Sequence, residues 1–272
     1  MKEVGMVKGL YYRLIIYLDT ADENDTNYNI AWYMVHNLEK LATIGISDLA
    51  KECYVSPATI SRFCRTLGYD NFAHLKQDCS YIVKLKQHSQ EITKIPVEAM
   101  RRTPEKASND YIGQIILALQ DMRDQLDWKA IDNVLHFIKE GKKVVFFGSQ
   151  FSHSAALHLQ ADLLMLGKFT IAYIDSEKQI ESAKHLDSDS VAVIITVNGN
   201  FAKTGSKAFH YIKKSKCKVA VITQQTNLEI AEFADEIIQL GDPQYGHVGK
   251  HTLLTLMELM SSRYHALFVH NK

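Results

Sequence analysis

The chain has few cysteines, few prolines and no excess of charge of either sign. Its 272 residues include four cysteines and four prolines, and 31 basic residues balance 31 acidic ones, so the formal net charge is zero. A net charge of zero excludes a globally basic protein that coats nucleic acid, and it leaves only a local basic patch for electrostatic binding. No cysteine pair has the CxxC spacing of a metal motif, so we expect no metal site. The four cysteines, which we expect to be buried thiols, are Cys53, Cys64, Cys79 and Cys217.

The sequence also lacks an uninterrupted apolar run of membrane-spanning length and an apolar N-terminal signal region. We therefore expect a cytoplasmic protein with no membrane partner. The composition, 46% hydrophobic and 23% charged over 272 residues, is typical of a globular protein with two domains.

Residues 46–68 have the pattern of two short helices joined by a tight turn. Leu49, Ala50 and Cys53 share one face of the first helix, while Ile60 and Phe63 lie on the inward face of the second. This is the pattern of a helix-turn-helix, in which the second helix lies in the major groove of DNA. Helical hairpins that never meet nucleic acid show a similar periodicity, so the spacing alone leaves both interpretations open.

The second helix has clear boundary signals and a polar outer face. Ser56 suits the N-cap, Pro57 the first helical position and Gly68 the C′ position, where a left-handed backbone is common. We expect Thr59, Ser61 and Arg62 to contact base edges, and Ser56, Arg65 and Lys76 to contact phosphates. The residues predicted to bind DNA are Ser56, Pro57, Ala58, Thr59, Ser61, Arg62, Arg65 and Lys76.

One residue departs from the usual helix-turn-helix. The turn commonly holds glycine, whereas this chain has Tyr54 there. A positive φ is strained for tyrosine, so the sequence predicts an altered turn.

The hairpin belongs to a predicted all-helical unit. Helices are expected at residues 6–18, around Ile30 to Leu38, and at 71–86, which places a DNA-binding domain at residues 1–86. Residues 87–108 are polar and contain Pro96 and Pro104, so they are predicted to form a linker that is helical in part.

From residue 109 to residue 272 the pattern changes to helices alternating with short apolar strands. This alternation predicts a doubly wound α/β domain with a parallel sheet, in which ligands bind beyond the carboxyl ends of the strands. The expected strands are 143–148, 169–174, 191–196, 218–223 and 236–240, and the expected helices are 111–124, 128–140, 154–166, 201–215 and 227–234.

Two strand ends carry small and polar residues that lead directly into helices. Backbone N–H groups at a helix N-terminus, with hydroxyl and amide side chains beside them, can hold an anion such as phosphate. The GxGxxG and P-loop spacings are absent, so no nucleotide cofactor is predicted. The predicted ligand-binding residues are Gly148, Ser149, Ser152, Thr196, Asn198, Gly199 and Asn200.

The chain resembles a known family at both ends. The stretch SDLAKECYVSPATISRFCRTLGYDNFAHLK is similar to the helix-turn-helix of RpiR-type regulators, and the residues from about 110 onward resemble a sugar isomerase (SIS) domain, most specifically in FFGSQFS, LQADLLMLGK and VITQQTNLEIAEFADEII. The resemblance implies a transcriptional regulator whose SIS domain senses a phosphosugar and controls a sugar-metabolism operon.

The ligand loops depart from the family pattern at four positions, of which Thr196 and Asn198 are polar replacements for serines. The first family loop is roughly G-x-G-x-S, and Gln150 stands in place of its second glycine; the second is roughly S-x-S-G-x-T, and Phe201 stands in place of its threonine. Because phenylalanine lacks a hydroxyl and is bulky, we expect it to fill the phosphate space with apolar surface. The site is therefore either rebuilt for a different ligand or degenerate.

Three functions remain open at this stage. A regulator would bind double-stranded operator DNA as a homodimer or tetramer and respond to a phosphosugar; a ligand-independent regulator would use the SIS domain only for dimerisation. A phosphosugar isomerase needs a general base near the loops, and no candidate pair has a diagnostic spacing, so we expect no catalytic residue and no enzyme activity. The candidate bases are His153, His158, Glu181, His185, His247, His251 and Glu258.

Overall fold

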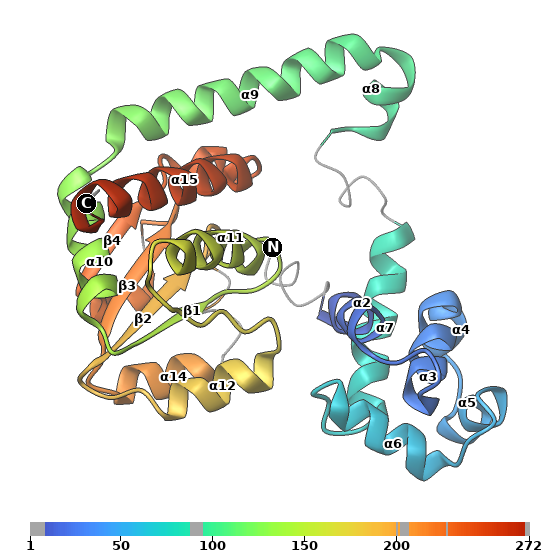
Figure 1. Cartoon of the computed structure of the whole chain (residues 1–272). Helices are drawn as coiled ribbons and strands as arrows, with labels where there is room; N and C mark the ends of the chain where they lie inside the picture. Colours follow the sequence, from blue (N-terminus) through green and yellow to red (C-terminus); the bar gives the residue numbers. More distant parts are fainter. Residues whose placement is uncertain (1–8, 88–94, 200, 202–206, 227, 270–272) are drawn as a thin grey trace. The chain divides into compact units, whose positions relative to one another are not determined.

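The structure is a computed structural model that describes residues 9–87, 95–199, 201, 207–226 and 228–269. Contacts divide the chain into two compact units, residues 1–97 and 98–272. The first unit is helical, and the second is built on a parallel sheet with helices on both faces (Figure 1).

The first unit contains six helices among its described residues. Their apolar faces meet in one cluster that includes Leu14, Met34, Leu49, Ile60 and Phe63. The predicted inward faces of the hairpin are thus confirmed. The helices are α2 (Gly9–Thr20), α3 (Thr26–His36), α4 (Leu38–Leu41), α5 (Ile46–Glu52), α6 (Pro57–Thr66) and α7 (Phe72–Gln87).

The boundaries of α6 follow the predicted signals. The Ser56 hydroxyl accepts a hydrogen bond from the Thr59 N–H at 3.1 Å, and Pro57 occupies the first helical position. Gly68 has φ +77° just beyond the last helical turn. Ser56 therefore pairs with an N–H at the start of the helix, Pro57 has no N–H there to leave unpaired, and Gly68 takes the left-handed backbone that ends the helix, as each residue type predicts.

Helix α5 ends in a Schellman motif with tyrosine at the position that normally holds glycine. The N–H of Val55 donates to the Ala50 carbonyl at 2.9 Å, and the N–H of Tyr54 donates to the Lys51 carbonyl at 3.1 Å. Tyr54 has φ +55°, and its residue surface is 97% exposed. The expectation of an altered turn is wrong, because the turn keeps the left-handed geometry and Tyr54 takes the strain.

The Tyr54→Gly substitution should therefore stabilise the first unit by about 0.5–1 kcal/mol. The free-energy cost of a left-handed backbone at tyrosine exceeds the extra conformational entropy that glycine loses on folding. Chemical denaturation followed by circular dichroism measures this free energy. Tyr54→Ala is the matched control, since alanine loses the ring but keeps the strain. An equal gain in both variants would show that the ring, and not the backbone, is unfavourable.

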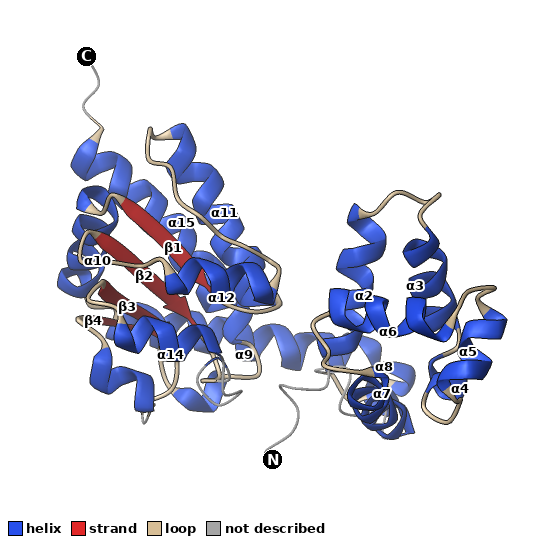
Figure 2. Cartoon of the chain, turned by 90° about the horizontal axis from the view of Figure 1, so that it is seen from below, coloured by secondary structure: helices blue, strands red, loops and turns tan. Residues whose placement is uncertain are grey.

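Among its described residues, the second unit contains four parallel strands in the order β1-β2-β3-β4. Figure 1 shows α12 and α14 together on one side of the sheet and α10, α11 and α15 on the other, and Figure 2 shows the same layers from below. Helix α9 packs along α15. The elements are α8 (Val97–Arg102), α9 (Pro104–Gln125), α10 (Trp128–Glu140), β1 (Lys143–Phe147), α11 (Phe151–Met165), α12 (Ser176–Lys184), β2 (Ser190–Ile195), α14 (Lys207–Lys214), β3 (Lys218–Thr223), the 3₁₀ helix η2 (Glu229–Phe233), β4 (Glu236–Gln239), the 3₁₀ helix η3 (Pro243–Tyr245) and α15 (Gly249–Phe268).

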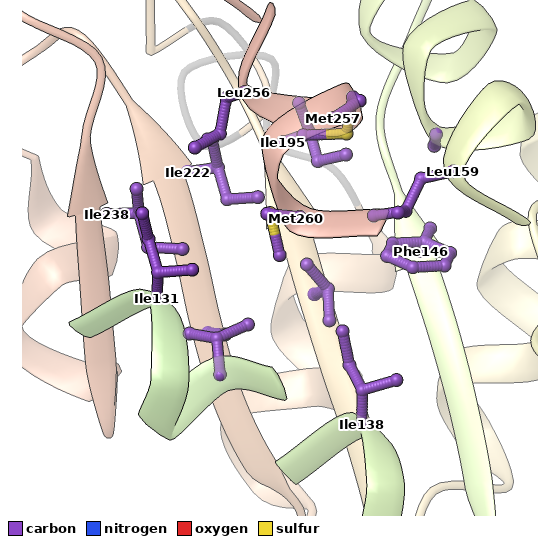
Figure 3. Packing of buried hydrophobic residues seen from close by; sticks show 14 of the residues in the cluster. Ile131, Ile138, Phe146, Leu159, Ile195, Ile222, Ile238, Leu256, Met257 and Met260 are labelled. Carbon is purple, nitrogen blue, oxygen red and sulfur yellow. The ribbon is translucent and has the colours of Figure 1, made fainter. Parts of the chain in front are cut away.

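Alternate residues of each strand enter different cores, because successive side chains point to opposite faces of a sheet. Val144 and Phe146 of β1 belong to the cluster beneath α10, α11 and α15, whereas Val145 and Phe147 belong to the cluster beneath α12 and α14. Figure 3 shows the first cluster, in which Phe146, Ile195, Ile222 and Ile238 of the sheet meet residues of α10, α11 and α15. Burial on both faces explains why these strands are continuous apolar runs.

Two predicted elements are wrong in detail. Residues 169–174 form only an isolated bridge, in which the Ile171 N–H donates to the Val144 carbonyl at 2.9 Å and its carbonyl accepts from the Phe146 N–H at 2.7 Å. Thr170 is buried, but Phe169, Tyr173 and Ile174 at the two ends of the segment are exposed, so the segment lacks the two-sided burial of the other strands. Residues 229–233 form a 3₁₀ helix in place of the expected helix at 227–234, and α12 was not predicted. Helices α8 and α9 occupy residues 97–102 and 104–125, so regular structure enters the predicted linker.

The isolated bridge defines the topology of the sheet. Because β1 pairs with β2 on one side, Ile171 pairs with its other edge. The chain thus runs outward from β1 to residue 171 and then returns across the sheet to β2. Strand order reverses between β1 and β2, which makes their carboxyl ends the switch point where doubly wound sheets bind ligands.

Candidate DNA-binding helix and ligand crevice

The outer face of α6 is open to solvent. Ala58, Arg62 and Arg65 are exposed, and Thr59 and Ser61 are half-exposed. Within the described residues, the Arg62 guanidinium makes a long hydrogen bond, at 3.4 Å, to the Ala58 carbonyl of its own helix. These side chains lie opposite the buried Ile60 and Phe63 and belong to a single face. The geometry therefore supplies a continuous polar and basic surface, which is the type of surface that enters a major groove.

Two of the predicted phosphate contacts are already engaged within the chain. The Ser56 hydroxyl lies 2.9 Å from the Thr59 hydroxyl. The Lys76 ammonium is half-buried and donates to the carbonyls of Thr43 at 3.1 Å and Ile44 at 2.8 Å. Lys76 thus ties α7 to the loop before α5, and a phosphate contact by Lys76 stays a prediction.

The structure brings the two predicted ligand loops together at the switch point. A Cβ on Gly148 would lie 3.3 Å from the Ile195 carbonyl, so the end of β1 passes directly beside the end of β2. Ser149 and Asn198 are exposed and Ser152 is half-exposed. Gly199 is buried with φ +70°, and Asn200 lies outside the described residues. The carboxyl ends of β1 and β2, where we expect the ligand crevice, thus carry two hydroxyl groups, one amide and the N-terminus of α11, an arrangement suited to an anion.

The loop after β1 is a type II′ turn with glutamine in place of glycine. The Ser152 N–H donates to the Ser149 carbonyl at 3.1 Å, and Gln150 has φ 53° and ψ −123°. Glycine is the usual residue at this position of a type II′ turn. Gln150 therefore adopts a backbone conformation that favours glycine, the residue that the family pattern has at this position.

The Gln150→Gly substitution should stabilise the second unit by about 1 kcal/mol. A non-glycine residue in this backbone region is strained by roughly 1–3 kcal/mol, and the larger loss of chain entropy when glycine folds offsets part of the gain from removing that strain. Thermal unfolding compared with wild type measures the effect. The control is Gln150→Ala, which removes the side chain and retains the strain. A loss of stability in Gln150→Gly would mean that the glutamine side chain contributes more than its backbone strain removes.

The loop after β2 differs from expectation at Thr196 and Phe201. Thr196 is buried, and its hydroxyl accepts a hydrogen bond from the Phe201 N–H at 3.2 Å. Phe201 is 8% exposed and lies in the cluster beneath α12 and α14, with its ring centroid 6.3 Å from that of Phe147. The prediction that Phe201 fills the phosphate space is therefore wrong, because its ring packs into the core below the loop.

The candidate general bases are dispersed over several elements. His153 is buried in α11, its Nε2 lies 3.0 Å from the Ala172 carbonyl, and burial lowers its pKa. Glu181 forms an ion pair with Lys184 on α12, and the Lys184 ammonium lowers the pKa of this carboxyl. The others are His158 on α11, His185 after α12, exposed His247, and His251 and Glu258 on α15. The part of the chain that the structure describes contains no group of three or more His, Cys, Asp or Glu side chains able to hold a metal.

Sequence reasoning missed two side chains that hold these sites in place. Gln179, buried on α12, donates to the Gly148 carbonyl at 2.8 Å and to the Tyr173 carbonyl at 2.7 Å, which fixes the end of β1. Arg13 of α2 donates to the Leu67 carbonyl at the end of α6. Both contacts are long-range, so local sequence patterns carry no signal for them beyond the small size of Gly68 beside Arg13.

Comparison with known proteins matches both units. Residues 16–94 match the profile of the helix-turn-helix domain of the rpiR family, and residues 137–270 match the SIS domain. An uncharacterized HTH-type transcriptional regulator of Providencia stuartii is 24% identical over 217 residues, which cover 78% of this chain and 74% of the relative. The HTH-type transcriptional regulator RpiR of Escherichia coli K12 is 23% identical over 215 residues, covering 79% of this chain and 71% of the relative.

A solved structure has the same two-part fold. The Vibrio vulnificus NanR protein complexed with ManNAc-6P aligns with a TM-score of 0.54 at 18% identity, covering 95% of this chain and 92% of that chain. The chain is therefore a two-domain protein with a helix-turn-helix domain and a SIS domain. It belongs to the RpiR-type helix-turn-helix transcriptional regulators. Among the described residues, none of the helices is both long and apolar enough to cross a bilayer.

Proposed function

We propose that this regulator binds a pseudo-palindromic DNA operator through α6 and changes its affinity for that operator when a phosphosugar binds at the carboxyl ends of β1 and β2. The observation that carries the proposal is the placement of Ser149, Ser152 and Asn198 at the switch point of the sheet, in a chain whose other unit is a helix-turn-helix. The NanR protein, whose fold is similar, is complexed with the phosphosugar ManNAc-6P.

The proposed ligand is an anion because the crevice offers donors and no carboxylate from its loops. The N-terminus of α11 has no side-chain N-cap bond, although the Ser149 carbonyl accepts from the Ser152 N–H, and the partial positive charge of the helix end favours an anion. Hydroxyl and amide groups on two adjacent loops also suit the hydroxyl groups of a sugar. The buried Thr196 hydroxyl is already used within its own loop, which leaves Ser149, Ser152 and Asn198 as the side chains that contact the ligand.

The same proposal includes a homodimer. Helix α11 exposes Leu157, Leu164 and Met165, and Met165 is 87% exposed. Exposed apolar side chains that recur at i, i+7 and i+8 form one helix face, and large patches of this kind mark protein–protein interfaces. A dimer places two copies of α6 on two half-sites, and light scattering should give twice the mass of the chain.

Catalysis is not part of the proposed function. An isomerase requires a base poised over the sugar carbons, whereas buried His153 contacts a backbone carbonyl and Glu181 is paired with Lys184. The similar proteins described above are transcriptional regulators by name.

A thermal-shift screen against hexose, amino-sugar and pentose phosphates tests the ligand. A sugar phosphate present at about a hundred times its dissociation constant stabilises the folded protein by about 2.7 kcal/mol and should raise the melting temperature by about 5 °C or more. The double variant Ser149→Ala, Ser152→Ala should lose this shift, whereas Ser261→Ala on α15 should keep it. A flat response to the whole panel would favour the alternative in which the SIS domain serves only for dimerisation.

A further inference from the structure

The C-terminal end of α6 is held by a side chain from α2. Arg13 Nη1 donates to the Leu67 carbonyl, and the guanidinium carbon lies 4.9 Å from the centroid of the Tyr69 ring. The carbonyls of Cys64 and Arg65 are already paired in a Schellman motif that ends the helix. Arg13 therefore satisfies the carbonyl of Leu67, the C-cap residue, and places a positive charge at the end of α6, where the helix dipole favours a cation.

Tyr69 extends this contact to α7. Tyr69 is buried, and its hydroxyl donates to Asp78 Oδ2 at 2.8 Å. Burial, followed by the Asp78 charge, raises the pKa of Tyr69 above its usual range, so the hydroxyl stays protonated and continues to donate. Arg13, Tyr69 and Asp78 together join α2, the end of α6 and α7 through a cation–π contact and two hydrogen bonds.

Gly68 leaves room for the arginine. Its φ of +77° favours glycine, and a Cβ at this position would also overlap the Arg13 guanidinium. The sequence predicts only the conformational reason for glycine at this position. The structure adds the close approach of the flexible Arg13 side chain to the backbone just beyond α6, which a Cβ would displace.

We propose that Arg13 is a positioning residue for DNA recognition. It fixes the orientation of α6 against α2 and α7, so that Ser61 and Arg62 on the outer face meet base edges in the correct register. Arg13 is half-buried and engaged with Leu67 and Tyr69, and it acts through α6 without touching DNA. This inference rests on the proposed function, in which α6 enters the major groove.

The Arg13→Gln substitution tests this role by its effect on sequence discrimination. Wild-type protein first selects its best duplex from a randomised library, and fluorescence anisotropy then gives the affinities for that duplex and for a scrambled duplex. At a temperature where both proteins are fully folded, Arg13→Gln should lower the ratio of the two affinities by about tenfold, which is the effect of about one mismatched base pair. Affinity for the scrambled duplex and the salt dependence should not change, since Arg13 contacts no phosphate. Arg13→Lys, which keeps the charge and loses the planar fork, should be intermediate.

Tyr17→Phe is the matched control on the same helix. It removes the hydrogen bond from the Tyr17 hydroxyl to Asp25 Oδ2, 2.8 Å long, and keeps the ring beside Phe63. It should lower stability and leave the affinity ratio unchanged. An unchanged ratio in Arg13→Gln would overturn the proposal by making Arg13 merely structural, and a salt slope reduced by about one would overturn it by making Arg13 a phosphate contact. Failure of the wild type to prefer any duplex would instead overturn the proposed DNA-binding function.

Discussion

Replacing Phe201 with threonine is expected to destabilise the SIS domain by about 3–5 kcal/mol and to create no phosphate site. The Phe201 ring is buried in the cluster beneath α12 and α14, beside Phe147, and threonine would leave a cavity there and bury a hydroxyl. Chemical denaturation measures the loss, and a sugar-phosphate thermal-shift panel measures any gain in binding.

Phe201→Leu is the control for this substitution. Leucine keeps most of the buried apolar volume and should destabilise by less than about 1.5 kcal/mol if it repacks well. The account of this loop would be contradicted if Phe201→Thr kept wild-type stability and bound a sugar phosphate that wild type does not bind. That result would place the ring in the ligand crevice, as the sequence pattern alone predicts.

The Arg62→Ala substitution should weaken binding to the selected duplex by about 1–3 kcal/mol and relax the preference at one base position. Arg62 is exposed on α6, and its hydrogen-bond partner in the described part of the chain is the Ala58 carbonyl of its own helix at 3.4 Å, so the stability of the fold should not change. Anisotropy titrations with duplexes that vary at single positions measure both effects.

Arg65→Ala is the comparison for Arg62→Ala, because Arg65 is also exposed on α6 and is predicted to contact phosphate. It should weaken binding to all duplexes about equally and reduce the salt slope by about one. If Arg62→Ala leaves the affinity for the selected duplex unchanged, α6 lies in the groove in a different register from the one proposed here.

The parts of the fold that follow from local chemistry could be predicted from the sequence. Ser56 caps α6 through its hydroxyl, Pro57 fits the first helical position because it lacks an N–H, and Gly68 takes the left-handed backbone that ends the helix. Helix α10 has the predicted bounds, Trp128–Glu140, because its apolar residues recur with helical spacing and Gly141 follows it.

The parts that depend on tertiary context could not be predicted. Residues 169–174 look like a strand, yet only Ile171 pairs with β1, since pairing depends on what covers the flanking residues. The direction of the Phe201 side chain is another example, because a loop pattern does not reveal whether a ring lies above or below its backbone. The contact from Arg13 to Leu67 joins residues that are far apart in the sequence, and periodicity contains no information about it.

The most direct test of the central claim is an anisotropy titration of wild-type protein with its selected duplex, in the presence and absence of each sugar phosphate. The account predicts that the selected duplex binds at least about 10³-fold more tightly than a scrambled one, and that at least one sugar phosphate changes this affinity by about 5–150-fold. Equal affinity for selected and scrambled duplexes would contradict sequence-specific binding by α6. A selective affinity that no sugar phosphate alters would contradict the coupling between the crevice and the DNA-binding helix.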